Sequence, residues 1–548
     1  MFVPKTVEVS LKDLIKSVDI GEYKIPQFQR EYVWNIDKVV DLIDSVLKGF
    51  PIGSLILWET REELPEIKAV GGKDIENKND RIYTSYVIDG QQRLTSLYFA
   101  LNGLITESKP KVDCSQICVS LIAKNTEKLV FKKIPEDGNT NDYILLKELF
   151  WNAIPWVQEN IEKRTIHLSK VNEYNSILSQ YLIPTTKVKE GSLNLEQIIQ
   201  VFERINLGGK KLNLYSIVSA YNYVPGKFDL DKYFAELNTN KLINYGEISD
   251  TTFLQTISAC LIHKCNKPAI LEGLTQETKK LELRNQYSKI ENALLRAIDH
   301  LKGNNYGVRI RANLPYEALL VTFTYFYYKL KSNYPTEIQT KLLCDYFWRA
   351  ILTNSYVTAT DSTLNADLEK IDCILNNEQP QYEPFAFTHS NVIANGKSKS
   401  SAFSKGIICL MCTKTPKSFA CGQEVIIDNT ANSSFSKKQD HHFFPKKSKA
   451  ITQNKEYKNK VNNVVNIVLI DALTNDAINN KNPSQYIPEF KSKIADFDKI
   501  LKSHFIELDG YGLAEDDFEL FLEARSKAIF KELVGKLVLT KNDKIEEL

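Results

Sequence analysis

Residues 439–447 read QDHHFFPKK: a carboxylate, two adjacent histidines, two phenylalanines, a proline and two lysines. The chain of 548 residues contains only seven histidines, and two of them, His441 and His442, stand here side by side. Adjacent residues of a strand point to opposite sides, and beside a turn they can diverge around a small cavity. One imidazole can then bind a divalent ion while its neighbour takes a proton from water. A surface loop that happens to contain two histidines is the alternative.

Two further segments follow this pair along the chain. Residues 464–470 (VVNIVLI) predict a strand with Asn466 inside it, and residues 475–483 (NDAINNKNP) predict the start of a polar helix. The whole arrangement resembles the HNH (ββα-metal) nuclease motif, especially the form found at the C-terminal end of GmrSD-type restriction proteins. The resemblance implies that a divalent metal ion and a histidine base cleave DNA together.

The resemblance also implies a role for individual residues. It gives His441 as a metal ligand, His442 as the general base, Asn466 as the residue that pins the loop and orients the base, and Asn475 as the second metal ligand. An asparagine at this last position suits a hard ion such as Mg²⁺ (or Mn²⁺) better than zinc. The weaker candidates for the same position are Asn463, Asn479 and Asn480.

Charge is balanced over the whole chain but not around the histidine pair. With 70 basic and 68 acidic residues the net charge is +2, so no global field attracts nucleic acid. A local lysine cluster can bind the phosphate backbone of double-stranded DNA, although such a run is often only a solvated face. The DNA-binding candidates are Lys446, Lys447 and Lys449, within a larger group that includes Lys437, Lys438, Lys455, Lys458 and Lys460.

The length of the chain and its cysteines restrict the class of protein. A chain of 548 residues is too long for one core and predicts about three or four domains. The sequence shows no signal peptide and no apolar run that could span a membrane. Nine scattered cysteines predict reduced thiols in the cytoplasm. Cys409, Cys412 and Cys421 could suggest zinc, but a fourth ligand is missing and buried thiols are favoured.

A second polar motif lies near the N-terminus, where residues 86–97 read YVIDGQQRLTSL. An apolar strand ends at Asp89-Gly90 and a helix follows at once, so the first amides of the helix can bind an anion. Gln91, Gln92 and Arg93 would add side-chain donors for a phosphate. A salt bridge between Asp89 and Arg93 is the structural alternative, and the residues alone do not decide between the two interpretations.

Four ordered stretches give this N-terminal region a resemblance of its own. Residues 25–34 (IPQFQREYVW), 49–59 (GFPIGSLILWE), 87–97 (VIDGQQRLTSL) and 202–213 (FERINLGGKKLN) are similar to the landmarks of the GmrS-type domain. The resemblance implies a ParB-like (sulfiredoxin-like) fold that binds and hydrolyses a nucleotide, GTP or ATP being candidates. It places Asp89, Gly90, Gln91, Gln92 and Arg93 in the nucleotide motif, with Arg30 facing the same pocket. No Walker-type glycine loop occurs.

Helical periodicity dominates the middle of the chain. Residues 252–264, 281–301, 316–330 and 338–353 predict helices, and their aromatic residues predict a buried core. Residues 376–400 are polar and predict a linker, followed by an apolar helix at 402–412. The predicted fold class is therefore α+β and multidomain. We expect an N-terminal ParB-like domain at 1–225, a helical domain at 226–395 and an HNH domain with C-terminal helices at 396–548.

Three functions are compatible with these motifs. The first is an anti-phage restriction endonuclease that cuts modified phage DNA under the control of a nucleotide-binding or modification-sensing N-terminal domain. The second is a nucleotide-hydrolysing regulator with an inactive HNH module, and the third is a DNA-binding or scaffold protein without activity. The complete His-His, Asn and Asn set favours the first. The oligomeric state stays open, a homo-oligomer included.

Overall fold

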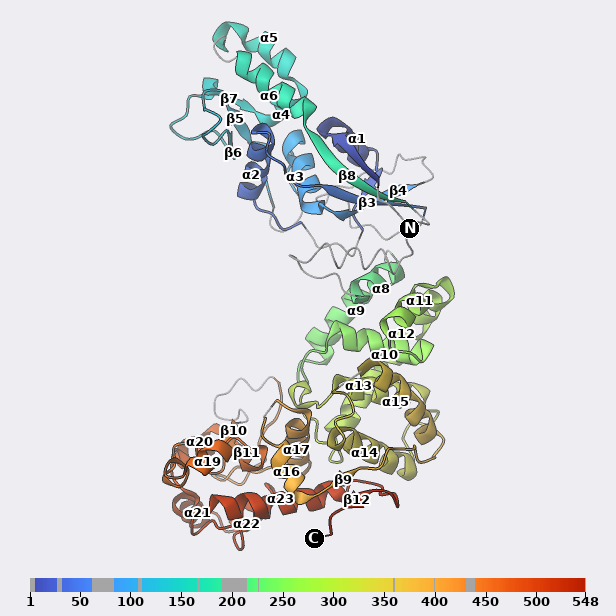
Figure 1. Cartoon of the computed structure of the whole chain (residues 1–548), viewed down its shortest axis with the longest axis vertical. Coiled ribbons are helices and arrows are strands. Elements are labelled where there is room, and N and C mark those ends of the chain that lie inside the picture. Colours follow the sequence, from blue (N-terminus) through green and yellow to red (C-terminus); the bar gives the residue numbers. More distant parts are fainter. Residues whose placement is uncertain are drawn as a thin grey trace. The chain divides into compact units, whose positions relative to one another are not determined.

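The computed structural model describes residues 5–26, 32–61, 83–106, 111–164, 168–189, 214–224, 226–357, 360–398, 400–429 and 439–547. The chain forms two compact units, Met1–Pro225 and Gly226–Leu548 (Figure 1). Each unit contains helices together with small β-sheets, so the protein has an α+β fold with more than one domain. None of the described helices is both long enough and apolar enough to cross a membrane.

The first unit is built on a mixed five-stranded sheet with the strand order β1-β8-β3-β4-β2. Within this sheet β3 is antiparallel to β4 and parallel to β8, and α3 packs against α1, α2 and α4. A second sheet has the order β6-β5-β7. The elements of this unit are β1 (Lys5–Ser10), α1 (Leu11–Asp19), β2 (Tyr23–Lys24), α2 (Ile36–Leu47), β3 (Leu55–Thr60), β4 (Thr84–Asp89), α3 (Gln91–Asn102), β5 (Cys118–Ser120), β6 (Val130–Phe131), η2 (Thr140–Asp142), β7 (Tyr143–Leu145), α4 (Leu146–Trp151), α5 (Ala153–Arg164), α6 (Leu168–Gln180), β8 (Leu182–Lys189) and α8 (Leu214–Asn222).

Local sequence signals explain where several of these elements begin. Ser10 caps α1 by accepting a hydrogen bond from the Asp13 amide at 3.1 Å, and Asn35 caps α2 in the same way through the Lys38 amide. Both helices bury one apolar face, which includes Leu14 and Ile43. The predicted strand-to-helix passage is also confirmed: β4 ends at Asp89, Gly90 has a φ of 92°, and α3 follows at once.

The second unit begins with a helical region and continues into small sheets and further helices. The four long helices predicted in its first half are present as α10, α12, α13 and α14. The elements are α9 (Leu230–Glu236), η4 (Leu237–Lys241), α10 (Asp250–Ile262), α11 (Lys267–Thr275), α12 (Glu277–Lys302), η5 (Arg311–Asn313), α13 (Glu317–Lys329), α14 (Glu337–Leu352), α15 (Thr360–Leu375), β9 (Ala386–Phe387), α16 (His389–Asn395), α17 (Ala402–Thr413), β10 (Gln439–His442), α18 (Lys449–Thr452), α19 (Lys455–Lys460), η6 (Val464–Asn466), β11 (Ile467–Ile470), α20 (Ala472–Ile478), α21 (Pro483–Lys491), α22 (Phe497–Lys502), α23 (Phe518–Val534) and β12 (Lys544–Ile545).

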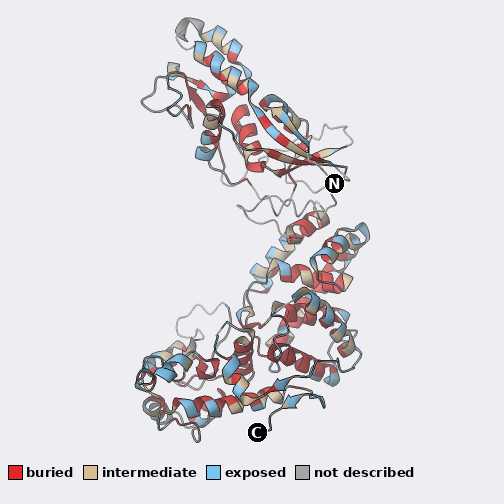
Figure 2. Cartoon of the chain, in the orientation of Figure 1, coloured by how far each residue is buried: buried red, intermediate tan, exposed pale blue. Residues whose placement is uncertain are grey.

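The aromatic residues of α13 and α14 form a buried core, as predicted. Phe323, Phe347 and Trp348 are fully buried, and the Phe347 and Trp348 rings meet edge to face with centroids 5.1 Å apart. Figure 2 shows α13 and α14 as mainly buried helices. Regions 226–395 and 396–548, which we expected to be separate domains, lie in the same compact unit, where α14 packs against α17.

Three sequence predictions for this unit are wrong in detail. Residues 376–400 are not a plain linker, because they contain β9 and α16, and Thr388 and Asn391 form a capping box that starts α16. The predicted strand at 464–470 begins with the 3₁₀ turn η6, so only Ile467–Ile470 is extended. The helix expected to begin at Asn475 begins at Ala472, because the Asp471 carboxylate caps it by accepting from the Thr474 amide at 2.9 Å.

The segment after α23 contacts the helical region and is held there by an ion pair and hydrogen bonds. The Arg349 guanidinium of α14 donates to both carboxylate oxygens of Asp543 at 3.1 Å, and these two side chains are almost completely buried. The Val538 amide donates to Asp345 at 2.9 Å, while Glu546 accepts from the amide of His389 at 2.8 Å. The strand β12 also pairs in parallel with β9. We call residues 536–547 the C-terminal strap.

A buried histidine makes the stability of the second unit depend on pH. Burial lowers the pKa of His504 from about 6.5 to about 4, and its Nε2–H donates to the Lys417 carbonyl at 2.9 Å. Because the folded pKa lies below the unfolded one, the unfolded chain binds more protons between these values. Stability therefore falls as the pH falls from about 6.5 towards 4. At pH 5 we expect His504 to lower the free energy of unfolding by about 2 kcal/mol relative to neutral pH.

Urea unfolding of wild type and His504→Gln at pH 7 and pH 5 measures this contribution. Glutamine can still donate to the Lys417 carbonyl but does not titrate, so the variant should lose about 2 kcal/mol less than wild type on acidification. An equal loss in both proteins would show that His504 is not the responsible group.

Candidate active site

The two histidines of the QDHH stretch lie at the end of a short antiparallel strand pair. Strand β10 pairs with β11, so His441 stands opposite Val468 and His442 stands opposite Ile467. Helix α20 follows β11 after a single residue and packs against β10. Two strands and a helix thus bring residues around 441 and around 475 to one place.

These elements surround an open pocket with a volume of about 610 Å³. The pocket contains both histidines and the predicted second metal ligand, Asn475. Asp476, to which the motif assigned no role, also lines the pocket next to Asn475. The lining residues are His441, His442, Pro445, Lys446, Lys447, Asn475, Asp476, Asn479 and Asn480.

Asn466 is fully buried beneath the pocket and fixes the loop after β10. Its Oδ1 accepts from the Phe444 amide at 2.9 Å, and its Nδ2 donates to the carbonyls of Phe444 at 3.1 Å and Val461 at 2.9 Å. The Asn466 carbonyl accepts a further bond from the Phe443 amide at 2.8 Å. Asn466 therefore holds the backbone directly after His442, while its side chain is engaged by backbone groups.

The imidazole of His442 contacts another asparagine, Asn462, which lies outside the motif. Nε2 of His442 lies 3.2 Å from Oδ1 of Asn462, an exposed residue between α19 and η6. His442 and Asn462 are 20 positions apart along the chain, and the spacing of the motif does not predict that they are in contact.

Asn479, another residue of the pocket lining, has a strained backbone. Its φ of 50° and ψ of −116° lie in a region that residues with a Cβ rarely adopt, and it ends α20. Its amide donates to the Asn475 carbonyl at 3.0 Å, and its Oδ1 accepts from Asn480 at 3.1 Å. Strain of this kind occurs most often at functional sites, where the surrounding structure has to maintain it.

Buried polar groups support the pocket from below. The Tyr486 hydroxyl donates to the Phe443 carbonyl at 2.8 Å. Tyr486 is fully buried, and this burial raises its pKa well above the ordinary value. The guanidinium of Arg525 is fully buried and donates to the carbonyls of Val465 and His504. The loop after the two histidines is thus bonded to α21, and the turn that contains Asn466 is bonded to α23.

The donors of the pocket fit a hard divalent cation that keeps several of its waters. His441 offers an imidazole nitrogen, Asn475 an amide oxygen and Asp476 a carboxylate at the exposed rim. Among the described residues no cluster of three or more His, Cys, Asp or Glu side chains could hold a metal ion by themselves. His441, Asn475 and Asp476 would supply only a few protein ligands, and Mg²⁺ is commonly bound in this way with several waters retained.

The predicted DNA-binding lysines are placed differently around the pocket. Lys446 and Lys447 are exposed and line it, whereas Lys449 is exposed at the first residue of α18 and is not part of the lining. Lys460 forms an ion pair with Glu519 at 2.6 Å. Lys437 and Lys438 lie outside the described residues. Two cations thus flank the histidines directly.

The N-terminal motif adopts the structural alternative that the sequence left open. Arg93 donates to Asp89 at 3.0 Å and to the Ile52 carbonyl at 2.8 Å, so its guanidinium is held between α3 and the turn before β3. A Cβ at Gly53 would overlap this guanidinium, which explains the glycine there. Gln91 and Gln92 are buried, and Gln92 accepts from the Val33 amide at 3.0 Å. Gly90 has no side chain to cap the first amides of α3.

Two other predicted parts of that site cannot be placed. Arg30 and the 202–213 stretch lie outside the described residues. The described part of the motif therefore shows an ion pair and two buried amides beside the N-terminus of α3, and it leaves the nucleotide role a prediction.

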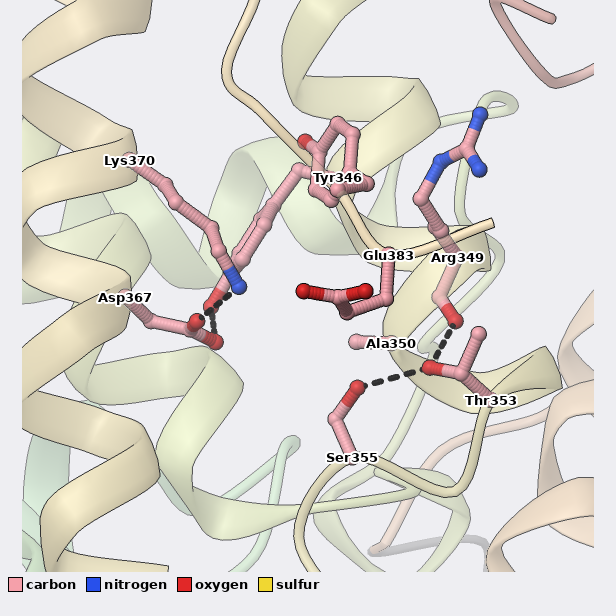
Figure 3. Close-up of a pocket in the computed structure, with 9 residues that line it drawn as sticks. Tyr346, Arg349, Ala350, Thr353, Ser355, Asp367, Lys370 and Glu383 are labelled. Carbon is pink, nitrogen blue, oxygen red and sulfur yellow. Dashed lines mark hydrogen bonds and ion pairs between the residues drawn. The ribbon is translucent and has the colours of Figure 1, made fainter. Parts of the chain in front are cut away.

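A different pocket, of about 260 Å³, lies in the helical region of the second unit and is drawn in Figure 3. The Lys370 ammonium and the Tyr346 hydroxyl both point at the buried carboxylate of Asp367, at 2.7 Å and 2.9 Å. The guanidinium of Arg349 is bound to the C-terminal strap instead. Since these charges compensate one another within the protein, the pocket between β10, β11 and α20 is the better candidate for an active site.

Similarities to known proteins agree with a nuclease. Residues 11–223 match the protein family described as "GmrSD restriction endonuclease, N-terminal domain". Over this part the chain is thus similar to a class of restriction endonucleases, a class whose substrate is DNA. An uncharacterized protein of Methanocaldococcus jannaschii is 26% identical over an alignment of 610 residues, which covers 96% of this chain and 98% of the relative.

Proposed function

We propose that this chain is a restriction endonuclease that hydrolyses phosphodiester bonds of double-stranded DNA at an HNH (ββα-metal) site. The observation that carries the proposal is the single pocket into which β10 and α20 bring His441, His442 and Asn475. The match of residues 11–223 to a restriction endonuclease family supports DNA as the substrate.

The two histidines of the pocket have different roles in the proposed reaction. His441 and Asn475 would hold one Mg²⁺ or Mn²⁺ ion together with water. Bound there, the ion would supply positive charge for the scissile phosphate and the leaving oxygen. His442 accepts a proton from the attacking water as the general base, and a neutral imidazole is suited to this near pH 7. Asn466 keeps the backbone after His442 in place.

Lysines next to the histidines attract the DNA backbone. Lys446 and Lys447 line the pocket, and Lys449 is exposed nearby on α18. Contacts of this kind bind phosphates without reading the sequence, so the affinity they provide should decrease with salt concentration.

The N-terminal unit would regulate the nuclease. We assign to it a ParB-like fold that binds or hydrolyses a nucleotide, GTP or ATP, and senses modified phage DNA. The motif involved comprises Asp89, Gly90, Gln91, Gln92 and Arg93, with Arg30 as a further member. The N-terminus of α3, which follows Gly90 directly and carries Arg93 in its first turn, supports an anion site there. The nine cysteines form no disulfide, which supports a reducing compartment such as the cytoplasm.

Metal dependence is the first test of this function. Purified protein is incubated with unmodified plasmid or modified phage DNA, with and without each NTP, in Mg²⁺, in Mn²⁺ or in EDTA. We expect cutting in the two metals, loss of cutting in EDTA, and recovery when excess Mg²⁺ is returned, because water at the site needs the cation's charge for attack on the phosphate.

The same experiment separates this function from its alternative. Cutting that persists in EDTA would contradict the metal site. If DNA stays whole under every condition while nucleotide is consumed by wild type but not by Arg93→Ala, the chain is a nucleotide-hydrolysing regulator with an inactive nuclease module.

A further inference from the structure

We infer that Asn462 is a positioning residue for His442: it keeps the proton of the neutral imidazole on Nε2 and thereby leaves Nδ1 to accept the proton of water. The inference rests on the proposed nuclease function. It assigns a task to a residue that lies outside the His-His, Asn and Asn pattern.

The chemistry of the contact determines which nitrogen carries the proton. The atom 3.2 Å from His442 Nε2 is Oδ1 of Asn462, a carbonyl oxygen that can only accept a hydrogen bond. In a neutral imidazole one nitrogen is a donor and the other an acceptor. A donor at Nε2 therefore makes Nδ1 the basic atom, and the contact selects one tautomer of the general base.

Asn462 can do this because two buried asparagines immobilise the segment that carries it. On one side Asn463 donates to the Ile393 carbonyl at 2.7 Å and accepts from the Val465 amide at 3.0 Å. At the end of η6, Asn466 is bound to Phe444 and Val461. The Val464 amide also donates to the Gly396 carbonyl at 2.8 Å, so the turn is anchored to α16 as well.

The contact also fixes the orientation of the ring. The pairing of His442 with Ile467 fixes its backbone, but rotation of an imidazole about its last side-chain bond is broad and roughly two-fold. A hydrogen bond to a rigid partner selects one of the two ring orientations. Asn466, whose side chain is bound entirely to backbone groups, supports the loop, and Asn462 supports the ring.

Loss of this contact should lower the rate of the chemical step and leave DNA binding unchanged. Asn462 is exposed, so its replacement removes no buried packing. We expect Asn462→Leu to reduce kcat roughly 10- to 100-fold with little change in KM, since misplacement of a reacting group costs rates of this order. Asn462→Asp keeps an acceptor oxygen and should recover most of the activity at pH 8.

The experiment combines cleavage kinetics with nitrogen NMR of histidine rings labelled with ¹⁵N. The His442 signals are assigned by their loss in His442→Gln, and the control is Asn459→Leu, the same substitution at an exposed site on α19 three residues earlier. Wild type, Asn462→Asp and the control should show the tautomer with the proton on Nε2. Asn462→Leu should show averaged ring signals and the reduced kcat.

Two results would overturn the inference. One is an Asn462→Leu protein whose His442 ring signals equal those of wild type, and the other is altered ring signals with unchanged kcat. If wild type cuts no DNA, the proposed function fails by itself, and the ring spectra still decide whether Asn462 determines the tautomer of His442.

Discussion

Replacement of His442 by alanine should abolish DNA cleavage while DNA binding stays close to that of wild type. The imidazole lies in the pocket with His441 and Asn475 and is the proposed acceptor of the proton from water. A positioned general base contributes about 10² to 10⁴ in rate, so the remaining activity should fall below detection in a plasmid assay. Lys446 and Lys447 are unchanged in the variant and should still hold the DNA.

Cleavage is measured on supercoiled DNA and binding by fluorescence anisotropy in Mg²⁺ for the same preparations. His263→Asn serves as the control, because His263 lies at the end of α10 and far from His442 along the chain. Its φ is 60°, a conformation that asparagine tolerates. This variant should cut like wild type. Detectable cleavage by the His442→Ala protein would remove His442 from the role of base.

Replacement of Asn466 by alanine should destabilise the second unit by about 3 to 5 kcal/mol. The side chain is fully buried and makes three hydrogen bonds to the backbone of Phe444 and Val461. Alanine would leave one N–H and two carbonyl groups buried without these bonds, and each such group costs about 1–3 kcal/mol. The loop after His442 would also loosen, so cleavage should decrease together with stability.

Urea unfolding gives the stability, and hydrogen exchange in peptides from residues 439–470 locates the change. The control is Asn480→Ala, which removes an exposed amide from the same pocket and should unfold like wild type. Equal unfolding of Asn466→Ala and wild type, with unchanged protection of β10 and β11, would contradict the role of Asn466 as the anchor of the loop.

The sequence predicts most reliably the features that local periodicity determines. Helices such as α2, α12 and α14 follow from apolar residues at helical spacing, and the burial of Phe323 and Phe347 follows from their number on neighbouring helices. The pattern of the QDHH stretch, the apolar run and the asparagine-rich helix also suffices to predict that His441, His442 and Asn475 lie together.

Features that depend on contacts between distant residues are not visible in the sequence. The bond between His442 and Asn462 bridges 20 positions, and the bond from Arg525 to the Val465 carbonyl bridges 60. The polar composition of 376–400 suggested a linker, because composition does not show that Val392 of α16 is buried against the rest of the unit. Tertiary packing overrides local composition in each of these places.

The C-terminal strap has a consequence for the order in which the protein can be made. Arg349 and Asp543 are separated by 194 positions along the chain, and Asp345 and Val538 are separated by 193. While the chain is being synthesised, the helical region therefore exposes an incompletely paired Arg349 and Asp345 until residues 538–546 have left the ribosome. Pairings at such separation form slowly because a long loop must close first. Residues 439–480, which form the β10–β11–α20 pocket, are synthesised earlier, so the proposed nuclease module leaves the ribosome before the strap that completes its unit.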